Sequence, residues 1–120
     1  MLKLLLESLG YSVLTAANGK EALSAVSNND LDLVLTDFNL PDMTGPSVIR
    51  CVRQNQNGSG HIPVVVLTAV DAQEYRELAA EAGCDAFLSK PADFRILEGT
   101  LERLLAERSL RNETLCAARQ

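Results

Sequence analysis

Short runs of aliphatic residues alternate with helical patterns along most of the chain. Each run is short enough for a strand and is bounded by polar or turn-forming residues. Residues 64–67 are apolar at consecutive positions, as a strand that is buried on both faces of a parallel sheet requires, so we expect this strand to be the best buried. The pattern predicts strands at residues 11–16, 31–36, 62–68 and 84–89.

Helical spacing of apolar residues fills the segments between these runs. Leucines recur at this spacing before Gly10, which predicts that the chain opens inside a helix. Gly10 and Gly83 each suit the left-handed position that ends a helix. Further helices are predicted at residues 18–29, 46–54, 71–82 and 93–108, the last with a buried stripe of Phe94, Leu97, Leu101, Leu104 and Leu105. We expect residues 111–120 to be a frayed tail or a linker remnant.

The order of these elements predicts an α/β fold. Each strand is followed by a helix long enough for a crossover, and such crossovers are right-handed in nearly all proteins. The expected solution is a doubly wound open parallel sheet with helices on both faces. No linker or low-complexity segment interrupts the pattern, so we expect one domain over residues 1–110.

Polar residues stand at three predicted strand ends: Asp37, Thr68 and Lys90. In doubly wound sheets, ligands bind beyond the carboxyl ends of the strands. A carboxylate, a hydroxyl and an ammonium group at one edge can together accept a phosphoryl group, with Asp37 as the nucleophile, Thr68 as a hydrogen-bond donor and Lys90 paired with the phosphoryl oxygens. Singly, each residue is more commonly a cap, a turn residue or a solvated charge.

Composition and charge narrow the function. Apolar residues make up 47% and charged residues 22% of the 120 residues, which is typical of a globular protein. The 16 acidic and 11 basic residues give a net charge of −5, which disfavours direct binding of nucleic acid. No apolar run is long enough to span a bilayer and no secretory signal opens the chain, so we expect a cytoplasmic protein without membrane insertion. Cys51, Cys84 and Cys116 are expected to be free thiols.

The motifs around these strand ends resemble those of response regulator receiver domains of two-component signalling systems. DLVLTDFNLPDMTG, at residues 32–45, is similar to the phosphoacceptor loop of that family. VVVLTA at residues 64–69 resembles its switch strand, and FLSKP at residues 87–91 resembles its lysine loop. NGKEAL at residues 18–23 is similar to the entry to the family's second helix, and the intervals between the motifs are close to the family's usual spacing.

The resemblance assigns roles to individual residues. It implies a flavodoxin-like fold in which Asp37 is the phosphorylated residue, Thr68 the switch hydroxyl and Lys90 the phosphate-binding lysine. Phe87 lies at the family's switch-aromatic position, although a purely structural role in the core is equally compatible with the sequence. Pro91 matches the family's cis-proline position.

One part of the family's site has no counterpart in the sequence. In the family, the first strand ends in two acidic residues that help to hold a magnesium ion, and that strand would precede Met1 here. Asp37 and the backbone carbonyl of Asn39 remain as ligands. Because Mg²⁺ prefers octahedral oxygen coordination, we expect it to bind weakly or not at all.

The same difference affects the sheet. In the family's strand order, 2-1-3-4-5, the missing strand would lie between residues 11–16 and 31–37. Three explanations are open: the sequence starts too late, the two strands close directly on each other, or a second chain fills the gap.

Two functions from different classes remain. The first is a phosphorelay receiver that accepts a phosphoryl group from a sensor histidine kinase or a histidine phosphotransfer protein and signals to an output protein or domain. Such a receiver is not an enzyme beyond its own phosphorylation and dephosphorylation, and it can form a dimer. The second is a pseudo-receiver that keeps the docking surface but is not phosphorylated. A haloacid-dehalogenase-like phosphatase would require a second acid where Asn39 stands.

Overall fold

The computed structural model describes residues 2–29, 31–54, 62–69, 72–89, 94–106 and 114–118. Strands and helices alternate along these residues, as the sequence predicts. The helices are α1 (Leu2–Ser8), α2 (Gly19–Asn28), α3 (Gly45–Gln54), α4 (Gln73–Ala82) and α5 (Phe94–Ala106). The strands are β1 (Ser12–Ala16), β2 (Leu33–Thr36), β3 (Val64–Thr68), β4 (Ala86–Ser89) and β5 (Thr114–Ala118).

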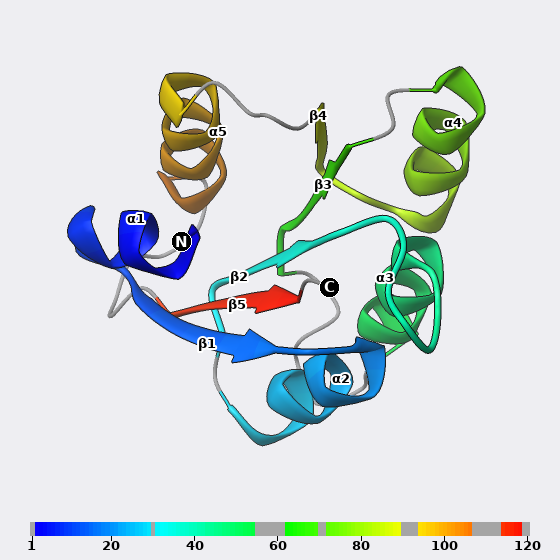
Figure 1. Cartoon of the computed structure of the whole chain (residues 1–120), viewed down its shortest axis with the longest axis horizontal. Coiled ribbons are helices and arrows are strands. Elements are labelled where there is room, and N and C mark those ends of the chain that lie inside the picture. Colours follow the sequence, from blue (N-terminus) through cyan, green and yellow to red (C-terminus); the bar gives the residue numbers. More distant parts are fainter. Residues whose placement is uncertain are drawn as a thin grey trace.

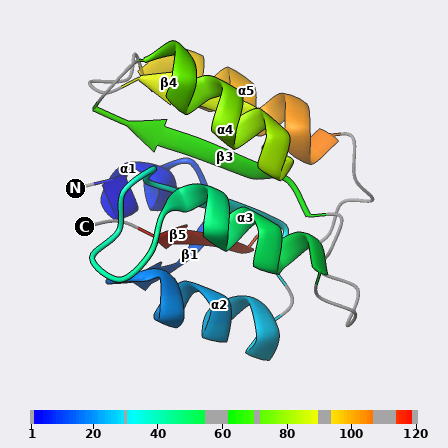
Figure 2. The ribbon, with the colours of Figure 1, turned by 90° about the vertical axis from the view of Figure 1, so that its right-hand side faces the viewer.

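The five strands form one sheet in the order β1-β5-β2-β3-β4. All neighbouring strands are parallel, so their carboxyl ends meet at one edge. Figures 1 and 2 show the strand arrows of β3 and β5 pointing toward the end of the molecule where the loop between β2 and α3 lies. The predicted parallel α/β fold is therefore confirmed.

The second position of the sheet is occupied by β5, the last strand in the described chain. It pairs with β1 from Ser12↔Thr114 to Ala16↔Ala118, and with β2 from Leu33↔Leu115 to Thr36↔Ala118. The expectation that 111–120 is a frayed tail is thus wrong for Thr114–Ala118. The backbone groups of β1 and β2 that face each other across the gap need hydrogen-bond partners, and this segment supplies them.

Two of the three explanations for the missing strand are not borne out. Since β5 lies between β1 and β2, these two strands do not close on each other, and no second chain is required in the gap. The segment of the chain that completes the sheet is one that none of the three sequence-based explanations considered.

Helices cover both faces of the sheet, and an apolar cluster lies between the sheet and the helices on each face (Figure 1). The side chains of β2 alternate between the two clusters: Leu33 and Leu35 face α1 and α5, while Val34 faces α2, α3 and α4. β2 and β3 are buried along their whole length, which confirms the prediction for residues 64–67 and extends it to β2. The leucine stripe predicted on α5 is buried at Leu97, Leu101, Leu104 and Leu105.

Helix ends follow the predicted chemistry in part. Gly10 and Gly83 have φ angles of 97° and 106°, the left-handed conformation that the sequence predicts after α1 and α4. The amide of Gly83 donates to the carbonyls of Ala79 and Ala80. Helix α4 begins at Gln73 with Ala72 as its N-cap, and residue 71, where the sequence predicts the start of this helix, lies outside the described residues.

At the end of the sheet opposite to the carboxyl ends of the strands, Arg53 of α3 binds the segments that precede β3 and β4. Its guanidinium donates to the carbonyls of Ile62 and Gly83 at 2.6 to 3.1 Å and forms an ion pair of 2.8 Å with Asp85. Asp85 in turn accepts a hydrogen bond from the amide of Val64. These contacts join α3 to both ends of the βα unit that contains α4. Across the described ranges, no helix is long and apolar enough to cross a membrane.

Candidate functional site

The carboxyl ends of β2 and β3 bring Asp37 and Thr68 to the same edge of the sheet. Thr36 is paired with Val66, so Asp37 is level with Leu67 and Thr68 is one residue further along β3. Thr68 is buried and Asp37 is half-buried. Two of the three residues that the sequence predicts at this site are therefore neighbours in space, on a rigid part of the fold.

The remaining predicted residues belong to the end of β4. Ser89 is paired with Thr68, and Lys90 follows it in the sequence. Lys90 and Pro91 lie outside the described residues. Phe87 is half-buried and packs against the cluster beneath α2, α3 and α4, with the Arg76 guanidinium 4.8 Å from the centre of its ring. Phe87 therefore combines a core contact with a cation–π contact to α4.

The loop that carries Asp37, residues 37–45, is a compact turn that we call the acceptor loop. The Leu40 amide donates to the Met43 carbonyl at 3.0 Å, and Asn39 and Thr44 form an isolated antiparallel bridge. The Asn39 amide lies 3.4 Å from Oδ1 of Asp37 and donates to it. The backbone amide of Asn39 is thus held beside the Asp37 carboxylate, and the role of its carbonyl as a metal ligand stays a prediction.

Gly45 closes the acceptor loop. Its amide donates to the Phe38 carbonyl, and a Cβ atom at this position would lie only 2.7 Å from the carbonyl oxygen of Asp37. The start of α3 can approach the Asp37 backbone so closely because residue 45 has no side chain. This contact gives a physical reason for the glycine in the motif.

Asp42 connects the acceptor loop to α2. Its Oδ1 accepts a hydrogen bond from the Gly19 amide at 2.7 Å, and its Oδ2 accepts one from the Lys20 amide at 3.0 Å. The hydrogen bond from the Gly19 amide, with help from the Lys20 amide and the Lys20 charge, lowers the pKa of this carboxyl below its ordinary value. Asp42 is therefore a carboxylate bound at the N-terminus of a helix that begins 23 residues earlier in the chain.

Phe38, the residue after Asp37, is buried and stacks on Tyr75 of α4. The two ring centroids are 4.0 Å apart and the rings are parallel to within 3°. The neighbouring residue Arg76 lies over Phe87. Helix α4 therefore contacts both Phe38 of the acceptor loop and Phe87, the residue at the predicted switch-aromatic position.

The described residues do not provide a complete magnesium site. They contain no group of three or more His, Cys, Asp or Glu side chains that could hold a metal ion. At the strand ends, Asp37 supplies a carboxylate, and Asn39 can supply a carbonyl. Mg²⁺ usually keeps several waters in its octahedral shell, so these two groups are the protein ligands that the described residues would offer it.

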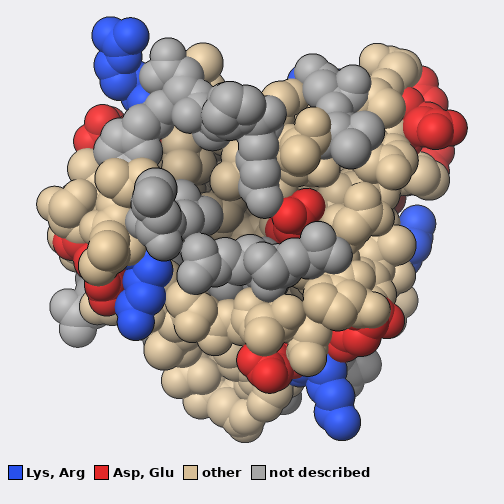
Figure 3. All heavy atoms as spheres, viewed as in Figure 1, with Lys and Arg blue, Asp and Glu red and all other residues tan. Residues whose placement is uncertain are grey.

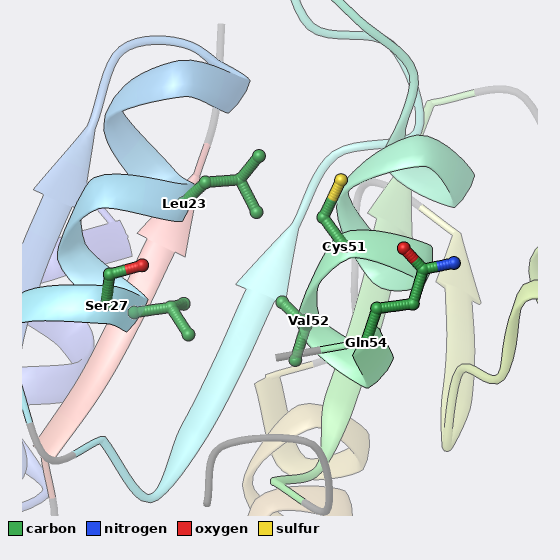
Figure 4. Close-up of a pocket in the computed structure, with 6 residues that line it drawn as sticks. Leu23, Ser27, Cys51, Val52 and Gln54 are labelled. Carbon is green, nitrogen blue, oxygen red and sulfur yellow. The ribbon is translucent and has the colours of Figure 1, made fainter. Parts of the chain in front are cut away.

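A cleft of about 350 Å³ lies elsewhere, between α2 and α3 (Figure 4). It is lined by Leu23, Val26, Ser27, Cys51, Val52 and Gln54. Cys51 is exposed and Cys84 is half-buried, and both are free thiols as predicted; burial raises the pKa of Cys84. The side chain of Cys116 is not described. None of the predicted site residues lines this cleft.

The surface charge agrees with the acidic composition. Figure 3 shows basic side chains projecting separately at the margin of the face seen in Figure 1, with acidic side chains between them. Among the described residues on this face, the basic groups do not form a continuous patch.

Some residues of the site could not be identified from the sequence. Asp42 was one of several polar residues in a turn, and its role depends on α2 lying against the acceptor loop. The stack of Phe38 on Tyr75 joins residues on opposite sides of β3 in the sequence. The available signal was local only: an acid after a proline in a turn and an aromatic residue on a helix.

Comparison with known proteins establishes the family. The model of the response regulator receiver domain matches residues 1–102, so the chain belongs to this family. The matched region ends before β5 begins, and β5 therefore occupies its place in the sheet without being part of the match.

Curated relatives carry this domain in different settings. The chain is 39% identical over 103 residues to the sensor histidine kinase RcsC of Escherichia coli K12, and this match covers 86% of the chain and 10% of RcsC. It is 34% identical over 87 residues to the polar-differentiation response regulator DivK of Brucella anthropi, covering 72% of the chain and 70% of DivK. The chain thus spans about a tenth of the sensor kinase and most of the response regulator.

Solved structures confirm the flavodoxin-like receiver fold. A putative response regulator from Chloroflexus aurantiacus has a TM-score of 0.83 and 33% identity, with 88% of this chain and 86% of that one covered. The receiver domain of a sensor histidine kinase from Pseudomonas aeruginosa PAO1 has a TM-score of 0.80 and 32% identity, with 88% and 85% covered. The latter structure has a magnesium ion coordinated in its active site cleft.

Proposed function

We propose that this receiver domain accepts a phosphoryl group on Asp37 and passes the signal to a protein partner. The observation that carries the proposal is the position of Asp37 beside Thr68, at adjacent strand ends and within the acceptor motif of a receiver domain. The donor would be a phosphohistidine of a sensor histidine kinase or of a histidine phosphotransfer protein. Relatives that are themselves sensor histidine kinases or response regulators support such a relay.

The transfer is a substitution at phosphorus. A carboxylate oxygen of Asp37 forms the new O–P bond while the N–P bond of the phosphohistidine breaks, and the electron pair returns to the imidazole nitrogen. In this proposal the Thr68 hydroxyl donates a hydrogen bond to a phosphoryl oxygen. The resemblance gives Lys90 the role of pairing with the phosphoryl oxygens. The domain would act on no other substrate, so we do not propose a separate enzymatic activity.

Magnesium, which is coordinated in the active site cleft of the Pseudomonas receiver domain, would neutralise charge on the phosphoryl group if it bound at this edge. None of the roles proposed above for Asp37, Thr68 and Lys90 depends on the ion. We propose that transfer is slow and that added magnesium accelerates it only weakly.

The incomplete metal site also favours a second candidate function. A pseudo-receiver would use the same fold and the same surfaces to bind its partners, without phosphorylation of Asp37. Contacts of α4 with Phe38 and Phe87 would then only stabilise the domain.

Labelling of Asp37 distinguishes the two functions. The folded chain would be incubated with acetyl phosphate, or with a phosphorylated histidine phosphotransfer protein, with and without magnesium chloride, and analysed by intact-mass spectrometry. We expect a gain of one phosphoryl group that the Asp37→Asn variant lacks. The Asp32→Asn variant, which changes a buried acid before β2, is the matched control and should still be labelled. Absence of labelling in a folded sample would support the pseudo-receiver.

A further inference from the structure

Asp42 joins the acceptor loop to the first turn of α2. The first turn of α2 already has its own reciprocal cap, in which Asn18 Oδ1 accepts from the Glu21 amide at 2.8 Å and Glu21 Oε1 accepts from the Ala17 amide at 3.0 Å. Asp42 accepts hydrogen bonds from the Gly19 and Lys20 amides, one on each of its carboxylate oxygens. The internal cap leaves the Gly19 and Lys20 amides without a partner in the helix, so Asp42 both satisfies these amides and fixes the acceptor loop to α2.

A second contact holds the same part of the loop against α2. The side chain of Met43 fills the space above Gly19, where a Cβ atom would collide with its Cγ and Sδ atoms. Gly19 is buried although it is the first residue of α2. Two consecutive loop residues, one polar and one apolar, therefore fix the loop to this helix.

The fixed residues are connected to the reacting end of the loop. The Met43 carbonyl accepts from the Leu40 amide at 3.0 Å, and the bridge between Asn39 and Thr44 spans the loop. Asn39 in turn donates to Oδ1 of Asp37. A movement of Asp42 away from α2 would therefore be transmitted to the backbone beside the phosphoacceptor carboxylate.

We propose that Asp42 is a positioning residue for phosphoryl transfer: by binding the Gly19 and Lys20 amides it fixes the acceptor loop so that the Asn39 backbone stays beside Asp37. Asp42 does not contact the phosphoryl group. This inference rests on the proposed function of Asp37. It assigns α2, which carries none of the predicted site residues, a direct part in the geometry of the site.

The first test is kinetic. Formation of the acyl phosphate would be followed at increasing acetyl phosphate concentration for the wild type, Asp42→Ala and Asp42→Asn, with Glu102→Ala on the exposed side of α5 as the matched control. Loss of alignment should lower the saturating rate on the order of tenfold for Asp42→Ala, with the half-saturating concentration unchanged. Asp42→Asn keeps an acceptor oxygen and should recover part of the rate, while Glu102→Ala should match the wild type.

The second test does not depend on phosphorylation. In amide NMR spectra, Asp42→Ala should shift the resonances of Gly19 and Lys20, and also that of Asn39, whose hydrogen exchange should become faster. If Asp42→Ala does not fold, Gly19→Ala replaces it, because the added methyl displaces Met43 while Asp42 is retained; it should shift the Asn39 resonance and slow the transfer.

The outcomes separate the two proposals. A wild-type chain that is never labelled would overturn the proposed function and with it a role of Asp42 in transfer, and the Asn39 resonance would then decide only whether Asp42 fixes the acceptor loop beside Asp37. An Asn39 resonance that does not respond to Asp42→Ala would overturn the positioning role. So would a wild-type transfer rate in that variant, even if the Gly19 and Lys20 resonances shift.

Discussion

Gly45 shows how a single missing side chain determines the geometry of the acceptor loop. The carbonyl oxygen of Asp37 and the Cα atom of Phe38 occupy the space that a Cβ atom would need. Both neighbours are backbone atoms, so relief would require the phosphoacceptor segment itself to move. Gly45 therefore links the start of α3 to the position of Asp37.

The Gly45→Ala substitution tests this contact. Although alanine is the better helix former, we expect Gly45→Ala to destabilise the fold by about 1–3 kcal/mol, because the methyl group is forced into the Asp37 backbone. The free energy of unfolding in urea measures this effect. In Gly99→Ala, the matched control in α5, nothing lies within 4 Å of the new methyl group, and a gain of up to about 1 kcal/mol is expected. Equal effects of the two substitutions would contradict the proposed contact.

The lowered pKa of Asp42 predicts how the stability of the fold responds to acid. Its pKa is lowered in the folded state by the Gly19 amide, so its contribution to stability is present above the pKa of the unfolded chain and is lost as the pH falls through the folded value. Unfolded aspartate titrates near pH ~3.9, which places the loss below about pH 4. In this pH range the free energy of unfolding in urea should fall more steeply for the wild type than for Asp42→Asn. Parallel pH profiles for the two proteins would contradict this prediction.

Residues whose role follows from the topology of the sheet could be predicted from the sequence. Asp37 and Thr68 are examples, because parallel strands place their carboxyl ends together. Asp42 could not be predicted in this way. Its partners are 22 and 23 residues away, and the contact depends on how closely α2 approaches the acceptor loop, which no local pattern expresses.

At the scale of elements, α4 is the helix that contacts two parts of the site. Tyr75 stacks on Phe38, and the next residue of the helix, Arg76, lies over the ring of Phe87. The exposed Leu78 and the acids Glu74, Glu77 and Glu81 lie on the same helix. Helix α4 therefore connects the acceptor loop to Phe87 through two adjacent side chains.

The stack between Phe38 and Tyr75 can be measured directly. A double-mutant cycle with Phe38→Leu and Tyr75→Leu, analysed by urea unfolding, should give a coupling free energy of about 0.5–1.5 kcal/mol in favour of the two rings. Tyr75→Phe retains the ring and serves as the control, with the coupling preserved. Strictly additive effects of the two leucine substitutions would show that the rings do not interact.

The elements themselves were predictable where the apolar period is strong. The leucine stripe of α5 and the valines of β3 set both the type and the buried face of each element. The starts of helices were less predictable. Helix α4 begins after Ala72, whose side chain cannot cap it, so its start is set by the packing of Tyr75 and Ala79 and not by a capping residue.

For the whole molecule, β5 decides whether the sheet is continuous. It hydrogen-bonds to β1 on one side and to β2 on the other, so both halves of the sheet depend on it. A proline in its middle should therefore be far more harmful than in an edge strand, since proline lacks the amide that a ladder requires.

We expect Cys116→Pro to lower the unfolding midpoint sharply or to prevent folding, as judged by circular dichroism during urea unfolding. Cys116→Val, which retains the amide and favours a strand, is the matched control and should remain folded. Similar midpoints for the proline and valine variants would contradict the placement of β5 between β1 and β2.

The fold class was predictable from the whole sequence, but the role of Thr114–Ala118 was not. These five residues include two alanines and show no alternation of apolar and polar positions, so their intrinsic preference for a strand is weak. The position between β1 and β2 makes them a strand, and only the assembled sheet contains that position.

The position of β5 also has a consequence for the order in which the molecule can assemble. During synthesis, β1 leaves the ribosome long before its neighbour β5, because Ser12 pairs with Thr114, which lies near the other end of the sequence. Until then the nascent chain carries a sheet split at its middle, with two unsatisfied strand edges that could recruit a strand from elsewhere. Contacts between such distant segments also slow folding, so closure of the sheet would come late.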